Sequence, residues 1–197
     1  MKSIKSIIAV SALFVAAASF AGAQVLAHSG DIAGFGGYGT IHNSGDPSGD
    51  SHPTFGASAG YNVTPGVTVL GEYTYMTLGN FGSGVTSKVQ LFGGAARFNF
   101  LTSTKVVPYG VVAFGDMRPT ESASGTSISG SGYYSAFGGG ASIYCGKNWG
   151  IRPEFRFVRS ELKPPMTTSY TGYNVFMESG SIFFQFGGTS AKKTTKK

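Results

Sequence analysis

Apolar and charged side chains alternate along residues 149–159. Odd positions from 151 to 157 carry Ile, Pro, Phe and Phe, whereas even positions from 152 to 156 carry Arg, Glu and Arg. Because successive side chains of a β-strand point to opposite faces, this stretch predicts a strand with one aromatic face and one charged face. Two structures accommodate such a strand. In a water-soluble sandwich a second sheet or helices would cover the aromatic face. In a membrane-spanning barrel lipid would cover it, while the charges would face a polar lumen.

The rest of the chain repeats this kind of pattern. Residues 53–63 alternate cleanly, with Phe55, Tyr61 and three further apolar side chains on one face and small or polar ones on the other. Eight such stretches are predicted as strands, at residues 32–41, 53–63, 67–78, 87–101, 106–117, 130–145, 149–162 and 171–187. No stretch after the first 23 residues is a convincing helix, so the sequence favours a membrane barrel over a sandwich.

The connections between the predicted strands alternate between long and short. The long connections span residues 42–51, 79–85, 118–129 and 163–170, and the short ones span residues 64–66, 102–105 and 146–148. An up-and-down transmembrane barrel has long loops outside and tight turns in the periplasm. Strands of roughly 10–15 residues, tilted near 45°, also suffice to cross a layer of about 25 Å. The sequence therefore predicts an all-β fold, an eight-stranded antiparallel up-and-down transmembrane β-barrel with both termini in the periplasm.

Aromatic residues gather near both ends of the predicted strands. Those near the short turns are Tyr61, Phe98, Phe100, Tyr109, Trp149, Phe184 and Phe186, and those near the long loops are Tyr73, Tyr75, Tyr133, Tyr134 and Phe157. Rings with a polar tip or edge are enriched where a membrane meets water. Two lipid-facing aromatic belts are therefore predicted.

Five charged residues fall on the polar side of their strands. They are Glu72, Arg97, Arg152, Glu154 and Arg156, and all lie in the half of the lumen nearer the periplasm. The interior of an eight-stranded barrel is just wide enough for side chains to fill it, and an unpaired buried charge costs several kcal/mol. We therefore expect an ion-paired network that plugs the lumen, with Glu72 paired to Arg97 on the neighbouring strand. A narrow conducting path through the network, or acid–base chemistry by Glu72 and Glu154, are the alternatives.

The first 23 residues have the form of a signal peptide. A basic start is followed by an apolar run from Ser6 to Phe20 and by the small residues Ala21, Gly22 and Ala23. The apolar run is shorter than the roughly 20 residues that a membrane-spanning helix needs. We expect the mature chain to begin at Gln24, the barrel to occupy residues 24–187, and residues 188–197 to form a basic polar tail.

Composition adds little chemistry to this picture. Four lysines in the last six residues account for much of the net charge of +6, so no nucleic-acid function is predicted. The single Cys145 excludes an internal disulfide and has no neighbouring His that would support catalysis. His28, His42 and His52 lack the spacing of metal ligands, although Asp46, Asp50 and His52 could bind a cation weakly. No metal or cofactor is expected.

These features together resemble a known family. The signal peptide, the eight amphipathic strands, the alternating loop lengths and the terminal pair Phe184 and Phe186 resemble the small eight-stranded outer-membrane barrels of the OmpA transmembrane-domain and OmpX kind. The resemblance implies an outer-membrane location in a Gram-negative-type bacterium, contact with outer-membrane lipids and lipopolysaccharide, and insertion by the barrel-insertion machinery. It also implies a lumen plugged by paired Arg and Glu. Ten residues follow Gly187, whereas such barrels often end on a terminal Phe, and no peptidoglycan-binding domain follows the barrel.

The expected function is that of a monomeric, non-enzymatic outer-membrane barrel with a structural role or a surface-interaction role through its long loops. A narrow, low-conductance channel is the alternative. A lipid-modifying enzyme is the third hypothesis, because His42 and Ser44 have the His-x-Ser spacing of lipid A deacylases, which are also small barrels. Both residues, however, lie in a predicted Gly/Asp/Pro loop without an evident Glu partner.

Overall fold

The computed structural model describes residues 25–43, 46–81, 85–123, 126–163 and 171–189. These residues form nine strand segments: β1 (Ala27–Asn43), β2 (Asp46–Thr64), β3 (Val67–Phe81), β4 (Val85–Asn99), β5 (Val106–Ala123), β6 (Thr126–Ser129), β7 (Ser131–Tyr144), β8 (Trp149–Lys163) and β9 (Thr171–Thr189). The predicted signal peptide and most of the predicted tail lie outside the described residues. In the described part of the chain, no helix is long and apolar enough to cross a membrane.

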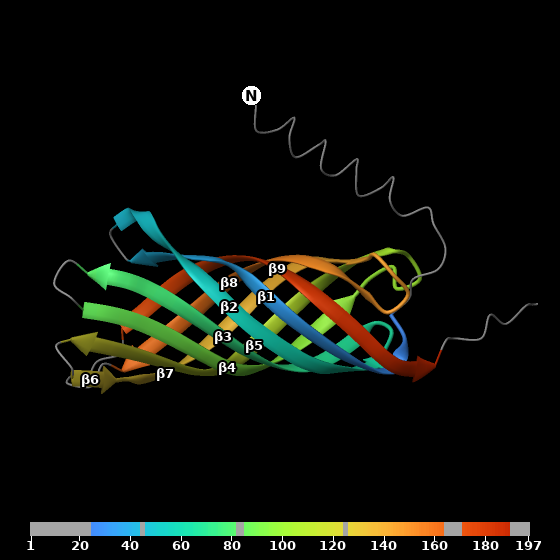
Figure 1. The fold of residues 1–197 in the computed structure, drawn as a ribbon, viewed down its shortest axis with the longest axis horizontal. Helices are drawn as coiled ribbons and strands as arrows, with labels where there is room; N and C mark the ends of the chain where they lie inside the picture. Colours follow the sequence, from blue (N-terminus) through green and yellow to red (C-terminus); the bar gives the residue numbers. More distant parts are fainter. Residues whose placement is uncertain (1–24, 44–45, 82–84, 124–125, 164–170, 190–197) are drawn as a thin grey trace, which may run out of the picture.

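The strands close into a barrel, as Figure 1 shows. Strands that follow one another in the chain pair antiparallel, except that β7 pairs with β5 instead of β6, and β9 returns to pair with β1. The short β6 pairs with β5 beyond the point where β5 leaves β7, so the wall itself has eight strands. The predicted fold class, an eight-stranded antiparallel up-and-down barrel, is confirmed.

The registers of the strand pairs fix the stagger of the barrel. The paired residues around one circuit are Ile32, Ala59, Gly71, Gly94, Phe114, Ser135, Arg159, Asn174 and His42. The circuit therefore returns to β1 ten positions beyond its start. A stagger of this kind requires the strands to tilt by about 35–45° relative to the barrel axis, and the tilt is visible in Figure 1. Because of this stagger, residues that are paired on neighbouring strands do not lie at the same depth along the barrel axis.

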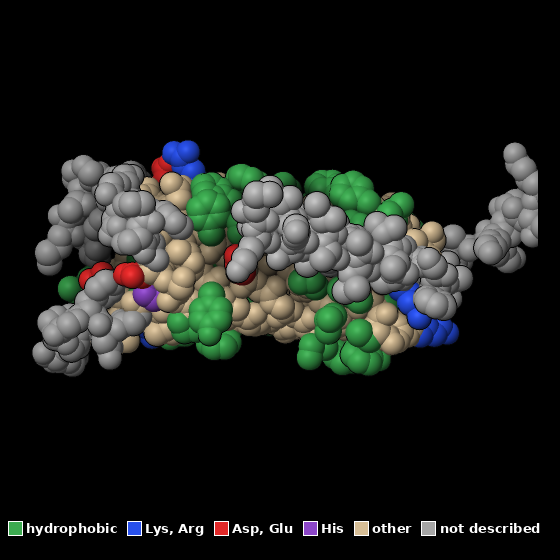
Figure 2. Space-filling view, turned by 90° about the horizontal axis from the view of Figure 1, so that it is seen from above, with side chains coloured by type: hydrophobic (Ala, Val, Ile, Leu, Met, Phe, Trp, Pro, Cys, Tyr) green, Lys and Arg blue, Asp and Glu red, His purple; other side chains and the backbone are tan. Residues whose placement is uncertain are grey.

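The outside of the barrel is mostly apolar, with the exposed carboxylate of Glu178 as an exception, and the inside contains the buried polar groups. On β2, Phe55 and Tyr61 are exposed whereas Thr54 and Asn62 are buried, and the large rings of Phe114 and Phe137 are 75% and 61% exposed. On the face seen in Figure 2, hydrophobic side chains gather in two groups, one toward each end of the barrel, with mainly backbone and other side chains between them. This inverted pattern is typical of a wall that faces lipid and excludes the soluble sandwich.

Most aromatic residues predicted for the belts do face outward. Tyr61, Phe98, Phe100, Tyr133, Trp149, Phe184 and Phe186 are exposed, and Tyr73, Tyr75 and Phe157 are partly exposed. One band lies nearer the long connections, which form extended hairpins, and this side of the barrel is called the hairpin side below. Rings within that band touch one another, and the ring centroids of Phe137 and Phe157 are 5.3 Å apart. Tyr109 and Tyr134 are the exceptions, because both side chains lie inside the barrel.

The long connections contain more strand than the sequence suggested. β1 and β2 stay paired as far as Asn43 and Asp46, and β5 continues to Ala123 opposite β6. Cross-strand hydroxyl pairs hold these extensions, with Oγ atoms 2.8 Å apart between Ser122 and Ser127. Segments rich in Ser, Thr and Gly were predicted as loops, but several form hairpins that extend the barrel at one end. The short connections lie at the opposite end.

The lipid face gives a first prediction. Val112 is outward and exposed on β5, and its cross-strand partners Ala96 and Phe137 carry no charge, so Val112→Arg should place a cation against lipid and destabilise the folded barrel by about 2–4 kcal/mol. Ser127→Arg on the exposed β6 should change stability little. Urea unfolding of the refolded barrel in lipid vesicles measures both. Equal tolerance of the two substitutions would contradict a lipid-facing Val112.

The orientation gives a second prediction, and the native Cys145 supplies the probe. Cys145 is exposed at the end of the barrel that carries the short turns. A membrane-impermeant maleimide should therefore leave wild-type protein unlabelled in intact cells and label it once the outer membrane is disrupted. In a Cys145→Ser background, Ser127→Cys should be labelled in intact cells, because β6 lies at the opposite end. Labelling of Cys145 in intact cells would show that the barrel has the opposite orientation in the membrane.

Candidate functional site

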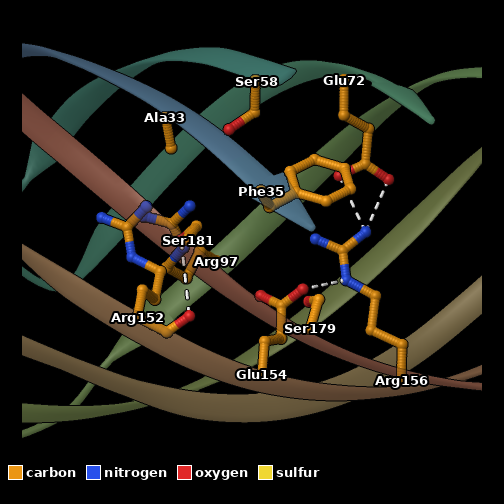
Figure 3. Close-up of a pocket in the computed structure, with 10 residues that line it drawn as sticks. All are labelled: Ala33, Phe35, Ser58, Glu72, Arg97, Arg152, Glu154, Arg156, Ser179 and Ser181. Carbon is orange, nitrogen blue, oxygen red and sulfur yellow. Dashed lines mark hydrogen bonds and ion pairs between the residues drawn. The ribbon is translucent and has the colours of Figure 1, made fainter. Parts of the chain in front are cut away.

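The structure brings the five predicted charged residues together in the lumen. Glu72, Arg97, Arg152, Glu154 and Arg156 line a common cavity, which Figure 3 shows together with Phe35 and Ser58. The cavity measures about 20 Å³, which is room for roughly one water molecule. These charges therefore line one small shared cavity.

Arg156 holds two carboxylates on the hairpin side of the cavity. Its Nη1 lies 2.6 and 2.8 Å from the two carboxylate oxygens of Glu72, and its Nε lies 2.5 Å from Oε1 of Glu154. Two tyrosines complete this group, because Tyr109 donates to Glu154 at 2.8 Å and Tyr134 donates to Glu72 at 3.3 Å. Charge-assisted hydrogen bonds of this kind are the strongest that side chains make.

Asp31 holds two guanidiniums on the other side of the cavity. Nη2 of Arg152 donates to Oδ2 of Asp31 at 2.8 Å, and Nη1 of Arg97 donates to Oδ1 at 3.5 Å. Arg152 also donates from Nε to Ser142 at 2.9 Å and lies over the ring of Phe183, with its Cζ 4.2 Å from the centroid. All three charged side chains of this group are buried.

Asp31 was not predicted from the sequence, and Glu72 has a different partner from the one predicted. β1 begins at Ala27, before the predicted start at residue 32, so Asp31 lies inside the strand and faces the lumen. The predicted Glu72–Arg97 pair is wrong, because Glu72 binds Arg156 and Arg97 binds Asp31. That pair was predicted because the two residues lie on neighbouring strands at a similar expected depth. The register of β3 and β4, however, does not place them opposite each other. Arg97 pairs with Thr68, four residues along β3 from Glu72.

With Asp31 included, the network is electrically neutral. Three guanidiniums face three carboxylates, namely Arg97, Arg152 and Arg156 against Asp31, Glu72 and Glu154. The Asp31 group carries one excess positive charge and the Arg156 group one excess negative charge, and the two groups meet at the cavity. Buried charges are tolerated when they are paired and hydrogen-bonded, so this balance permits six ions in a closed interior.

Tyr109 and Tyr134, predicted for the aromatic belts, belong to this network. Their side chains are only 4% and 3% exposed. Glycines opposite them make the room, because a methyl group at Gly93 would overlap the Tyr134 hydroxyl and one at Gly140 would crowd the Tyr109 hydroxyl. The sequence signal was ambiguous, since Tyr134 follows Tyr133 directly and successive residues of a strand face opposite sides.

The lumen on the hairpin side of the network contains an apolar cluster, and the polar side chains of Thr54, Thr74, Ser87 and Ser160 are buried among the same strands. Buried side chains from six strands pack there, among them Leu70, Met76, Val89, Leu91, Val111, Met117, Val158, Val175 and Met177. The expected polar lumen is therefore correct only for part of the barrel. On these stretches both faces of a strand carry apolar residues in places, so the alternation alone did not show which face was inside.

Toward the short-turn end, neutral polar side chains from four adjacent strands are hydrogen-bonded to one another inside the barrel. Asn62 donates to Ser29 at 2.8 Å and accepts from Thr68 at 2.5 Å, and Asn99 donates to Thr68 at 3.1 Å. This chain of hydrogen bonds joins β1 to β4 across the end of the barrel. Short polar residues on even positions of β2 and β3 were its only sequence signal.

A family comparison settles what kind of barrel this is. The model of the family described as the outer membrane protein beta-barrel domain matches residues 7–178. The chain belongs to this family of outer-membrane β-barrels. It is thus an integral outer-membrane protein, as its exposed aromatic bands require.

Solved structures of other outer-membrane barrels share the fold. Neisserial surface protein A matches with a TM-score of 0.68 at 15% identity, over 80% of this chain and 97% of that one. Ail, the attachment invasion locus protein of Yersinia pestis, matches with a TM-score of 0.59 at 16% identity, over 82% and 100%. The N-terminal barrel domain of Pseudomonas aeruginosa OprF matches with 0.55 at 16%, over 82% and 99%. No curated protein sequence matches the chain.

Among the other candidate residues, the described side chains of His28, Asp50, His52 and Cys145 form none of the ion pairs of the lumen network. Ser44, the second residue of the predicted His-x-Ser pair, falls outside the described residues, so that hypothesis stays a prediction. In the described strands and turns, no group of three or more His, Cys, Asp or Glu residues is placed to hold a metal ion. His28 instead lies 3.2 Å from the hydroxyl of Tyr61 through its Nδ1.

Proposed function

We propose that this outer-membrane barrel is closed to ions and solutes and has a structural or surface-interaction role without a catalytic site. One observation carries the proposal. A neutral network of six charges spans the lumen, an apolar cluster fills the barrel beyond it, and the cavity between the two halves of the network measures about 20 Å³.

Passage of an ion would meet two barriers. It would have to separate buried ion pairs, and removing one partner of such a pair costs about 3–5 kcal/mol. It would then have to cross the apolar cluster, and hydrophobic constrictions in pores exclude water and ions. A narrow channel would require the ion pairs to separate and the apolar cluster to open at the same time.

The hairpin end favours a role at the surface. β5 and β6 extend past the wall with exposed Ser and Thr side chains, and β1 and β2 stay paired to Asp46. Among barrels of similar fold, Ail has been crystallised in complex with the heparin analogue sucrose octasulfate. That complex supports the proposal that a barrel of this fold can bind an external ligand.

Swelling of protein-containing liposomes tests the closed lumen. Vesicles with the refolded barrel should swell no faster than protein-free vesicles in isotonic glycine or arabinose, because the lumen has no continuous aqueous path. Vesicles with a general porin provide the positive control. Swelling that depends on the amount of folded barrel and declines with solute size would show an open pore.

A further inference from the structure

One carboxylate lies among the aromatic rings of the lipid-facing wall. Met177 is buried in the lumen, so the next residue on β9, Glu178, points outward, and its side chain is exposed. Glu178 pairs in register with Phe155 on β8 and with Tyr38 on β1, and both of these rings are exposed. Phe176 lies two residues nearer the hairpin side on the same strand. Glu178 therefore lies on the side of Phe176 that faces the middle of the membrane.

Glu178 has no counter-charge from the protein. In the described part of the chain it forms no ion pair with a Lys, Arg or His side chain. The outward cation of β8, Arg159, pairs in register with Asn174, four residues from Glu178 toward the hairpin side. An ionised side chain in the apolar part of a membrane is costly, and such side chains usually pair with an opposite charge. Glu178 is thus available to a cation that arrives through the membrane.

An open groove lies beside this carboxylate. It measures about 450 Å³, and its lining includes Glu178, Phe155, Pro153, Ala141, Gly140 and Gly139. Because Glu178 and Phe155 both point outward, the groove opens toward lipid. Gly139 pairs in register with Phe155, so the position beside that ring has no side chain to fill it. A mostly apolar concavity of about 300–1,000 Å³ with a single charged group is typical of small-molecule sites.

We propose that Glu178 and this groove bind an amphiphile that has one cationic ammonium head and an apolar chain. The carboxylate pairs with the head. The rings of Phe155 and Phe176, with centroids 5.9 Å apart, attract the same positive charge through their π faces. The apolar lining of the groove receives the chain. The pairing removes the cost of an isolated ion in lipid. The site lies on the outer wall, so it does not depend on a closed lumen.

Two probes with the same chain and the same ammonium group test the site. The full folded barrel is kept in a neutral maltoside detergent, and native mass spectrometry reports the fraction that retains each probe. Dodecyltrimethylammonium should bind at least about tenfold more tightly than dodecylphosphocholine, because the phosphate of the latter is repelled by Glu178. Glu178→Gln should weaken binding of dodecyltrimethylammonium by at least about tenfold, since the attraction between opposite charges is lost. Phe155→Leu should weaken it by about two- to fivefold, the factor for one exposed cation–π contact.

The matched control is Glu161→Gln on β8. Glu161 follows the buried Ser160, so it also points outward, but it accepts a hydrogen bond from Tyr133. Its substitution should leave binding of dodecyltrimethylammonium within about twofold of wild type. A gel shift on heating confirms that each variant is folded.

Three results would overturn the site. Equal binding by wild type and Glu178→Gln would mean that the probe only partitions onto the apolar wall. Equal loss in Glu178→Gln and Glu161→Gln would indicate non-specific attraction to surface charge. Equal retention of dodecylphosphocholine would show that the site does not select a cation. In lipid vesicles Glu178→Gln should be at least as stable as wild type, because no charge then faces lipid. A loss of stability would instead assign the carboxylate a structural role.

Discussion

Asp31→Asn is expected to destabilise the folded barrel by about 3–5 kcal/mol, the cost of leaving a buried charge without its partner. Asp31 accepts hydrogen bonds from Arg152 and Arg97, and all three side chains are buried. The amide keeps the shape of the side chain but removes its charge, so two buried guanidiniums would face each other uncompensated. Urea unfolding of the refolded barrel, followed by the gel shift on heating, measures the loss.

The matched control is Asp116→Asn on the outside of the barrel. Asp116 is exposed, and surface substitutions of this kind usually change stability by less than about 0.5 kcal/mol. If the Asp31→Asn variant proved as stable as the wild-type barrel, the ionic balance of the lumen would not contribute to stability.

The second large effect concerns Glu72 and the identity of its partner. Glu72→Ala and Arg156→Ala should each lower stability by about 3 kcal/mol, near the lower end of the range for buried pairs. In each variant the partner left behind retains another contact, Glu154 for Arg156 or Tyr134 for Glu72. The double variant should lose less than the sum of the two single losses. The coupling energy should lie between about 0.5 and 3 kcal/mol, as found for residues in contact.

A parallel cycle on Glu72 and Arg97 separates contact from proximity along the chain. These two residues lie on neighbouring strands, but the structure shows no bond between them. Their coupling should therefore be clearly smaller than that of Glu72 with Arg156. Stronger coupling of Glu72 to Arg97 would mean that the registers or the tilt of the barrel are wrong.

The eight strands could be predicted because alternation over ten or more residues is a strong signal. Residues 149–159 and 53–63 each showed two chemically distinct faces, and the structure keeps those faces apart. The strand ends were less predictable. The Ser and Thr residues of 118–129 are compatible with either loop or hairpin, and the pairing of β5 with β6 decides between them.

The members of the lumen network were easier to predict than its pairs. The alternation of side chains along a strand predicts whether a charged residue lies inside the barrel. The ten-residue stagger decides which charged residues lie at the same depth along the barrel axis. Glu72 on β3 therefore meets Arg156 on β8, across the lumen. Asp31 was missed because the glycines of β1 hide its alternation, and Tyr109 was misplaced because apolar residues on both sides of it obscure the parity.

Single-channel recording in planar lipid bilayers tests the closed lumen most directly. The wild-type barrel should insert, as judged by protease protection and the gel shift on heating, without steady openings above the baseline. Glu72→Ala should admit water beside Arg156 and raise any residual conductance. A large, steady wild-type conductance that Glu72→Ala leaves unchanged would contradict the account and show that the lumen is an open pore.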